Sequence, residues 1–243
     1  MIEFDWTRFE AVLFDLDGVL TSTAAVHATA WKQTFDTVLP ILIGEEARPF
    51  DIDEDYRAYV DGRPRYEGVA EFLRSRDIEL PWGDPSDPPG TETICAIGNA
   101  KNERIREVLA EGQVEPFPGS VALLDHLDAL GIPMAVVSSS ANAEQVLEAA
   151  GILDRFPVRI DGVVAAAESI PGKPAPDTFL EAVRRLGTEP SRAVVIEDAV
   201  AGVEAGVAGG FGAVIGVARH GDGEALSNAG ADVVVDDLAE LVP

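Results

Sequence analysis

Asp15 and Asp17 stand at the end of an apolar run, residues 11–16 (AVLFDL), which is typical of a buried strand. Side chains alternate along a strand, so both carboxylates leave the sheet edge on one side while Leu16 points back into the core. Such a pair repels itself unless a cation neutralises it, and a hard divalent ion with oxygen ligands, usually Mg²⁺, suits it. Gly18 permits the tight turn that follows. Asp-x-Asp-Gly turns are also common at protein surfaces, so further signals must decide.

Two more polar segments follow later in the chain. Ser138 opens a Ser-Ser-Ser-Ala-Asn segment before a predicted helix, where hydroxyls and backbone N–H groups suit a phosphate, although Ser140 or Asn142 could simply cap the helix. Lys173 precedes a predicted helix that begins near Asp177. A lysine at that place holds either a phosphoryl oxygen or the first aspartate, unless it is a solvated loop residue.

A second acidic pair, Glu197 and Asp198, ends the apolar run at residues 193–196 as the first pair ends its own. A helix cap is the alternative for this pair. The four signals come in the order aspartate pair, serine, lysine, acidic pair, and each lies at or just beyond the carboxyl end of a predicted strand. We therefore predict that they form one site for a metal and a phosphate.

Short β-branched runs alternate with helix-period segments from about residue 118 onward. This alternation predicts an α/β fold, a doubly wound parallel sheet whose ligands bind at the carboxyl ends of the strands. The expected strands are residues 11–16, 133–138, 162–165, 193–196, 213–217 and 233–235, and the expected helices include residues 120–130, 143–150 and 177–186.

Residues 23–116 lack this alternation. Helical segments at residues 24–38, 66–76 and 101–111 are separated by a loop rich in Pro, Gly and Asp at residues 80–90 (LPWGDPSDPPG). We predict a helical domain at 23–116, inserted into a core domain formed by 1–22 and 117–243.

Charge and composition exclude several classes of function. Acidic residues outnumber basic ones 43 to 18, a net charge of −25, which disfavours nucleic acid and anionic membranes as partners. The single cysteine, Cys95, forms no intrachain disulfide, and we expect it to be a small buried apolar residue. No apolar stretch reaches the ~20 residues of a membrane helix, and the first residues do not resemble a secretion signal. We expect a cytoplasmic monomer.

The four core motifs together resemble those of the haloacid dehalogenase superfamily of phosphotransferases. The matching positions are Asp15 to Val19, Ser138, Lys173 and Glu197-Asp198. The resemblance implies a Rossmann-like core with a cap domain, and a reaction through an aspartyl-phosphate.

The resemblance also assigns roles to these residues. It makes Asp15 the nucleophile and Asp17 the group that protonates the leaving oxygen and later deprotonates the acceptor. It makes the Asp15 carboxylate, the Asp17 carbonyl and Asp198 ligands of Mg²⁺, with Glu197 as outer support. Ser138 and Lys173 would then hold the phosphoryl oxygens.

Segments of the inserted domain resemble the β-phosphoglucomutase-like subfamily. The similar positions that imply substrate binding are Thr23, His27, Trp31, Gly62, Arg65, Lys101 and Asn102, together with Ser140 and Asn142 of the core. The resemblance places His27 at the hinge, Arg65 on the non-reacting phosphate, and Lys101 with Asn102 on the sugar phosphate. Lys101 at a helix start opposes the helix dipole unless an anion is near, which favours this function.

Other readings of the same residues stay open. His27 and Trp31 could belong to the core of the inserted domain, and Arg65 with Arg63 could be a solvated pair. His126 and His220 have no partners that the sequence indicates, so we expect them to be structural or exposed.

The chain also departs from the subfamily. Ala141 stands where a lysine is typical, and an acidic, proline-rich insertion lies around residues 84–89. We expect a mutase that interconverts β-glucose-1-phosphate and glucose-6-phosphate through the 1,6-bisphosphate. The alternatives are a phosphatase acting on a sugar or polyol monophosphate and, more remotely, a catalytically inactive regulatory protein.

Overall fold

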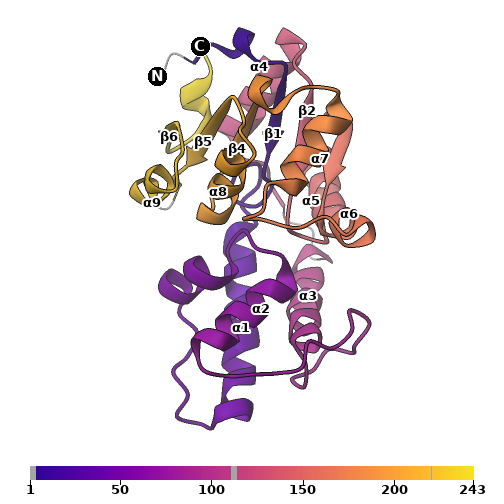
Figure 1. The fold of residues 1–243 in the computed structure, drawn as a ribbon, viewed down its shortest axis with the longest axis vertical. Helices are drawn as coiled ribbons and strands as arrows, with labels where there is room; N and C mark the ends of the chain where they lie inside the picture. Colours follow the sequence, from indigo (N-terminus) through magenta and orange to yellow (C-terminus); the bar gives the residue numbers. More distant parts are fainter. Residues whose placement is uncertain (1–3, 111–113, 220) are drawn as a thin grey trace. The chain divides into compact units, whose positions relative to one another are not determined.

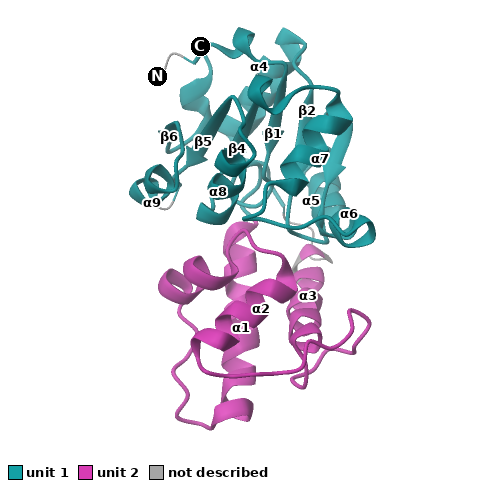
Figure 2. Ribbon diagram, viewed as in Figure 1, with its two compact units in different colours: residues 1–22, 114–243 teal, residues 23–113 magenta. Residues whose placement is uncertain are grey.

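The computed structural model describes residues 4–110, 114–219 and 221–243. The chain divides into two compact units, Met1–Ser22 with Val114–Pro243, here called the core, and Thr23–Gln113, called the cap (Figure 2). The sequence-based boundary at 116/117 lies three residues beyond this division. No helix within the described residues is long and apolar enough to cross a membrane.

The core is built on a six-stranded parallel sheet (Figure 1). The strand order is β3-β2-β1-β4-β5-β6, so the chain winds from the middle to one edge, returns and winds to the other, as in doubly wound folds. The α/β fold class is thus confirmed. The strands are β1 (Ala11–Phe14), β2 (Met134–Val137), β3 (Val158–Ile160), β4 (Ala193–Glu197), β5 (Ala213–Val217) and β6 (Val233–Val235).

Helices cover the sheet, and this explains why the central strands are continuous apolar runs. Residues of α7 and α8 share one hydrophobic cluster with alternate strand residues such as Leu13 and Val195. The intervening residues Val12 and Val194 are equally buried, so the opposite face is covered as well. The helices of the core are α4 (Pro118–Leu130), α5 (Ala143–Ala149), α6 (Gly162–Glu168), α7 (Asp177–Leu186), α8 (Val200–Ala208) and α9 (Gly223–Asn228).

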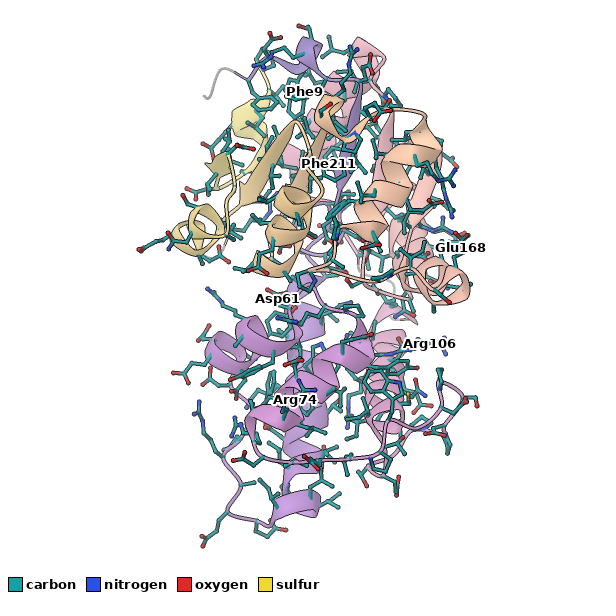
Figure 3. The ribbon with its side chains drawn as sticks, viewed as in Figure 1. Phe9, Asp61, Arg74, Arg106, Glu168 and Phe211 are labelled. Carbon is teal, nitrogen blue, oxygen red and sulfur yellow. The ribbon has the colours of Figure 1, made fainter. Side chains whose placement is uncertain are left out.

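Short 3₁₀ helices and aromatic contacts complete the core. They are η1 (Trp6–Arg8), η3 (Leu153–Arg155), η4 (Pro190–Arg192) and η5 (Leu238–Leu241). The ring of Phe179 on α7 meets that of Phe211, labelled in Figure 3, with 6.0 Å between centroids. The indole N–H of Trp6 donates to the Leu241 carbonyl at 3.1 Å and so links η1 to η5.

One strand prediction was wrong. Residues 162–165 (GVVA) begin helix α6, and the strand at this position in the sheet is β3, a few residues earlier. The Asp161 carboxylate accepts hydrogen bonds from the backbone N–H groups of Val163 and Val164, which starts a helix there. Four apolar residues are too few to distinguish a strand from a buried helix by periodicity.

The cap is helical, with α1 (Ala24–Ile43), the π-helix η2 (Ile52–Val60), α2 (Arg65–Ser75) and α3 (Ile94–Ala110). Its core is a cluster of aromatic rings in which Phe35 contacts Phe50 and Phe72 at centroid distances of 5.0 and 4.2 Å. Helix α3 begins seven residues before Lys101, so the expectation that Lys101 opposes a helix dipole was wrong. The π-helix was not anticipated from the sequence.

Candidate active site

The carboxyl ends of β1, β2 and β4 bring the core motifs together. Phe14 of β1 pairs with Val136 of β2 and with Ile196 of β4, so the next residue, Asp15, lies level with Glu197. The Asp15 N–H donates to the Ile196 carbonyl at 2.9 Å, which continues the ladder to this point. Both carboxylates are buried and stand on adjacent strands at the sheet edge.

Lys173 lies between these two carboxylates. Its Nζ is 2.5 Å from Asp15 Oδ1 and 2.6 Å from Glu197 Oε1, and it donates to the Val137 carbonyl at 2.8 Å. Only 1% of the side chain is exposed. Three acceptors therefore match the three N–H donors of the buried ammonium group. The reading of Lys173 as a solvated loop residue is wrong.

Burial sets the protonation of the three groups. Loss of hydration raises the pKa of Asp15 to about 6 and that of Glu197 to about 7, although Lys173 opposes both shifts. Burial by itself lowers the pKa of Lys173, but the two carboxylates outweigh it and hold that pKa above its usual value. The ammonium group of Lys173 therefore stays charged. The positive charge of Lys173 alone does not offset the cost of burying two ionised carboxylates, Asp15 and Glu197.

A divalent cation fits this deficit. Carboxylate oxygens of Asp15, Glu197 and Asp198 lie within 4.8 Å of one another, and they are hard ligands of the kind that Mg²⁺ prefers. Glu197 Oε2 already accepts hydrogen bonds from the N–H groups of Asp198 and Ala199, both at 3.0 Å, and Oε1 faces Lys173. Asp15 and Asp198 are therefore better placed as direct ligands than Glu197.

Gly202 of α8 makes room for the Glu197 carboxylate, and sequence reasoning missed it. A Cβ atom at this position would lie 1.8 Å from Glu197 Oε1 and 1.9 Å from its Cδ. No side chain larger than hydrogen fits there while Glu197 keeps its position. The available signal was a glycine in the interior of a helix, where that residue is unfavourable.

The serine segment forms a compact loop beyond β2. Ser138 Oγ accepts from the Ser140 N–H at 3.1 Å, and Ser140 Oγ accepts from the Asn142 N–H at 3.2 Å. All three residues are buried. Asn142 precedes α5 but its side chain makes no capping hydrogen bond. Gly162 closes the loop from the other side, since a Cβ there would lie 2.9 Å from the carbonyl oxygen of residue 139.

The turn after Asp15 carries Asp17, which is partly exposed. Gly18 adopts φ 90°, a conformation that favours glycine, and its N–H donates to the Thr21 carbonyl at 2.8 Å. Arg219, after β5, donates to the Gly18 carbonyl at 3.0 Å and pairs with Asp237. Arg219 was not anticipated, because nothing local marks a contact 201 residues away in sequence.

In the cap, the structure brings His27, Trp31 and Lys101 together. Lys101 Nζ is 3.0 Å from His27 Nδ1 and 4.9 Å from the centroid of the Trp31 ring. Burial and the charge of Lys101 hold the pKa of His27 well below its usual value, so the imidazole is neutral and its Nδ1 accepts a hydrogen bond from the Lys101 ammonium group. Thr23 precedes the first residue of α1 and Asn102 follows Lys101 on α3.

Arg65 opens helix α2, close after Gly62, which adopts φ 67° in the preceding turn. The Arg65 guanidinium lies over the Tyr66 ring at 4.8 Å from its centroid, and its Nη2 donates to the Tyr66 hydroxyl at 3.0 Å. The Nε is buried and has no hydrogen-bond partner among the described residues. A buried donor without an acceptor is costly, so a missing anionic acceptor would account for it.

Comparison with known proteins places the chain in a family. The model of the haloacid dehalogenase-like hydrolases matches residues 9–210, and the chain belongs to this family. The resemblance found in the core motifs is thereby confirmed.

Three relatives narrow the comparison. The chain is 49% identical to a β-phosphoglucomutase of Mycobacterium bovis, over 97% of this chain and 92% of that protein. It is 33% identical to the fructose-1-phosphate phosphatase YqaB of Escherichia coli, over 86% and 97% of the two chains. The crystal structure of a CbbY variant from Rhodobacter sphaeroides with xylulose-1,5-bisphosphate matches with a TM-score of 0.71 and 30% identity, over 96% of each chain. The chain is thus an enzyme of the phosphotransferase and phosphatase type.

Proposed function

We propose that this protein is a Mg²⁺-dependent β-phosphoglucomutase that converts β-glucose-1-phosphate to glucose-6-phosphate through the 1,6-bisphosphate. The observation that carries the proposal is the buried Lys173 between Asp15 and Glu197, with Asp198 beside them. Lys173 holds the Asp15 carboxylate in one position at the sheet edge, where it can attack a phosphoryl group, and its ammonium charge favours the binding of that group. The mycobacterial relative supports the choice of the mutase reaction.

In the proposed reaction, Asp15 attacks phosphorus. A bond forms between its carboxylate oxygen and the C1 phosphorus of the 1,6-bisphosphate while the bond from that phosphorus to the sugar oxygen breaks, and Asp17 gives its proton to that oxygen, which releases glucose-6-phosphate. Lys173 and Ser138 hold the phosphoryl oxygens as charge develops on them, and for this Lys173 exchanges one of its three present acceptors for a phosphoryl oxygen. In the return step the 6-hydroxyl of the next β-glucose-1-phosphate attacks the phosphorus on Asp15, the bond from phosphorus to Asp15 breaks and Asp17 accepts the hydroxyl proton, which re-forms the 1,6-bisphosphate.

The cation would be held by Asp15, the Asp17 carbonyl and Asp198, with Glu197 supporting them from behind. When bound, Mg²⁺ supplies positive charge that offsets repulsion between these carboxylates and the incoming phosphate. The experiment for this step is a calorimetric Mg²⁺ titration of the wild type and of Asp198→Asn, in which the variant should bind more weakly.

We assign the substrate's sugar and second phosphate to residues of the cap. Arg65 offers a buried Nε to the non-reacting phosphate, and Lys101 offers an ammonium group beside the neutral His27. The remaining positions proposed to contact the substrate are Thr23, Trp31, Gly62, Asn102, Ser140 and Asn142. A mutase needs such contacts because the bisphosphate must be retained while it reorients.

Phosphatase activity on a sugar monophosphate is the second candidate. The 33% identical fructose-1-phosphate phosphatase and the presence of Ala141 in the serine loop favour it. Phosphorus NMR of the enzyme with Mg²⁺, β-glucose-1-phosphate and a trace of glucose-1,6-bisphosphate separates the two. Accumulation of glucose-6-phosphate supports the mutase, inorganic phosphate alone supports the phosphatase, and neither product would support the inactive alternative. The control is Asp15→Asn, which should form neither.

A further inference from the structure

The acidic, proline-rich loop at residues 80–90 has no role in the function proposed above. It is mostly exposed, yet it is tied firmly to the first turn of α3. The N–H groups of Ile94 and Cys95 donate to the carbonyls of Pro81 and Trp82, both at 3.0 Å. The loop therefore occupies donors that an uncapped helix end would leave to solvent.

A chain of hydrogen bonds runs from this loop to Arg65. The side-chain N–H₂ of Asn99 donates to the carbonyls of Pro85 at 3.1 Å and Asp87 at 2.8 Å. Its Oδ1 is left facing the Tyr66 hydroxyl, which donates to it at 2.9 Å. The Tyr66 oxygen in turn accepts from Arg65 Nη2 at 3.0 Å. Each group has one fixed direction of donation, so the chain is polarised from Arg65 towards the loop.

The geometry of α3 allows this arrangement. A Cβ at Gly98 would lie 2.7 Å from Cδ1 of the Tyr66 ring, so glycine lets the ring lie against the helix. The Arg65 guanidinium lies over the same ring at 4.8 Å from its centroid, and Arg65 Cγ would also lie 3.2 Å from a Cβ at Gly98. Tyr66 thus fixes Arg65 both by stacking and by one hydrogen bond, and leaves its buried Nε for another acceptor.

We propose that loop 80–90 is a specificity element that orients Arg65 for the non-reacting phosphate of the substrate, acting through Asn99 and Tyr66 as positioning residues. This inference rests on the proposed function, in which Arg65 binds that phosphate. A guanidinium held in one orientation loses less conformational freedom when it binds a phosphate through two N–H groups. The insertion would thereby tighten binding of doubly phosphorylated sugars without touching them.

The test compares steady-state kinetics on β-glucose-1-phosphate, with the 1,6-bisphosphate as activator, for Tyr66→Phe, Asn99→Ala and Arg65→Ala. Tyr66→Phe keeps the ring and removes only the hydroxyl. We expect Tyr66→Phe and Asn99→Ala to raise the KM for the bisphosphate about three- to tenfold, the size of one lost hydrogen bond. Ser86→Ala, in the same exposed loop but outside the chain of hydrogen bonds, is the matched control and should match the wild type.

The double variant Tyr66→Phe/Arg65→Ala separates positioning from general structure. If Tyr66 acts through Arg65, adding Tyr66→Phe to Arg65→Ala should raise the KM no further. A threefold or larger additional rise would overturn the inference. The inference would also be overturned if Arg65→Ala raised the KM for the bisphosphate and Tyr66→Phe left it unchanged. The proposed function would stand in that case. An unchanged KM in Arg65→Ala would overturn both. Thermal unfolding of each variant checks that the cap is folded, and hydrolysis of acetyl phosphate, which has no second phosphate, reports on the core.

Discussion

Gly202→Ala places a methyl group where the Glu197 carboxylate lies. The new Cβ would stand 1.8 Å from Glu197 Oε1, whereas nonbonded carbon and oxygen atoms need more than 3 Å, so one of the two must move by over 1 Å. Glu197 is fully buried and is held by Lys173 and two backbone N–H groups. The substitution therefore strains or breaks the pair with Lys173.

The substitution has one stabilising and two destabilising effects on the free energy of unfolding, and the destabilising effects are larger. Replacing a helix glycine by alanine stabilises a helix by about 1 kcal/mol. Overpacking costs roughly 1–3 kcal/mol, and separating a buried ion pair costs about 3–5 kcal/mol. We expect a net loss of at least about 2 kcal/mol, or roughly 4–8 °C in Tm. Displacing the site by about 1 Å should lower kcat about a hundredfold.

Gly206→Ala is the matched control, since it makes the same change one turn later in α8. The three atoms nearest to its Cβ would belong to the side chains of Val214 and Val195, at 3.0–3.3 Å. Calorimetry and phosphoryl-transfer kinetics on both variants give the comparison, and Gly206→Ala should keep its activity. Glu197→Asp added to Gly202→Ala withdraws the carboxylate by one methylene and should restore part of the lost rate. If Gly202→Ala were as stable and active as Gly206→Ala, the fixed position of Glu197 would be refuted.

Three further predictions concern the roles proposed for Asp15, Asp17 and His27. Asp15→Asn should fold and should retain less than about a thousandth of the wild-type turnover, because no other carboxylate can take its place as nucleophile. Greater turnover would rule out an aspartyl-phosphate. Asp17→Asn should slow phosphoryl transfer but keep Mg²⁺ affinity, and a calorimetric titration in which both are lost would make its side chain a metal ligand. An NMR titration should show that His27 stays neutral below pH 6.5. In the unfolded chain this imidazole takes up a proton near pH 6.5, whereas in the folded chain it does not. The His27 contribution to the free energy of unfolding should therefore fall as the pH drops below 6.5. Lys101→Met should raise this pKa, and a wild-type pKa near 6.5 would contradict the burial of the ring.

The sequence predicted best those features that a short segment encodes. Asp15, Lys173 and Glu197 each follow or precede a recognisable element, and parallel strands bring their carboxyl ends to one edge, so their meeting could be anticipated. The start of α3 could not be predicted, because Gly98 and Asn99 lower the helix propensity of the segment just before Lys101. The structure shows that both residues are instead engaged with Tyr66.

Contacts between distant residues escaped sequence reasoning for a different reason. Arg219 reaches the carbonyl of Gly18, and Gly202 matters only because a carboxylate lies against its Cα. Such roles depend on atomic distances across the fold: nothing local marks Arg219, and a glycine inside a helix marks Gly202 without showing what lies against it. The mistaken strand at residues 162–165 shows the converse, since Asp161 overrides a β-branched run by local hydrogen bonding.

The central place of β1 in the sheet has a consequence for biosynthesis. β1 ends at residue 14, but its neighbours in the sheet are β2 and β4, which are synthesised later and end at residues 137 and 197. At about 5–20 residues per second, β1 waits roughly 9–36 s for its second partner, and the whole cap is synthesised in the interval. Until β4 is synthesised, the nascent chain therefore exposes at least one unpaired edge of the apolar strand β1, which makes it a substrate for chaperones and a hazard if translation stalls.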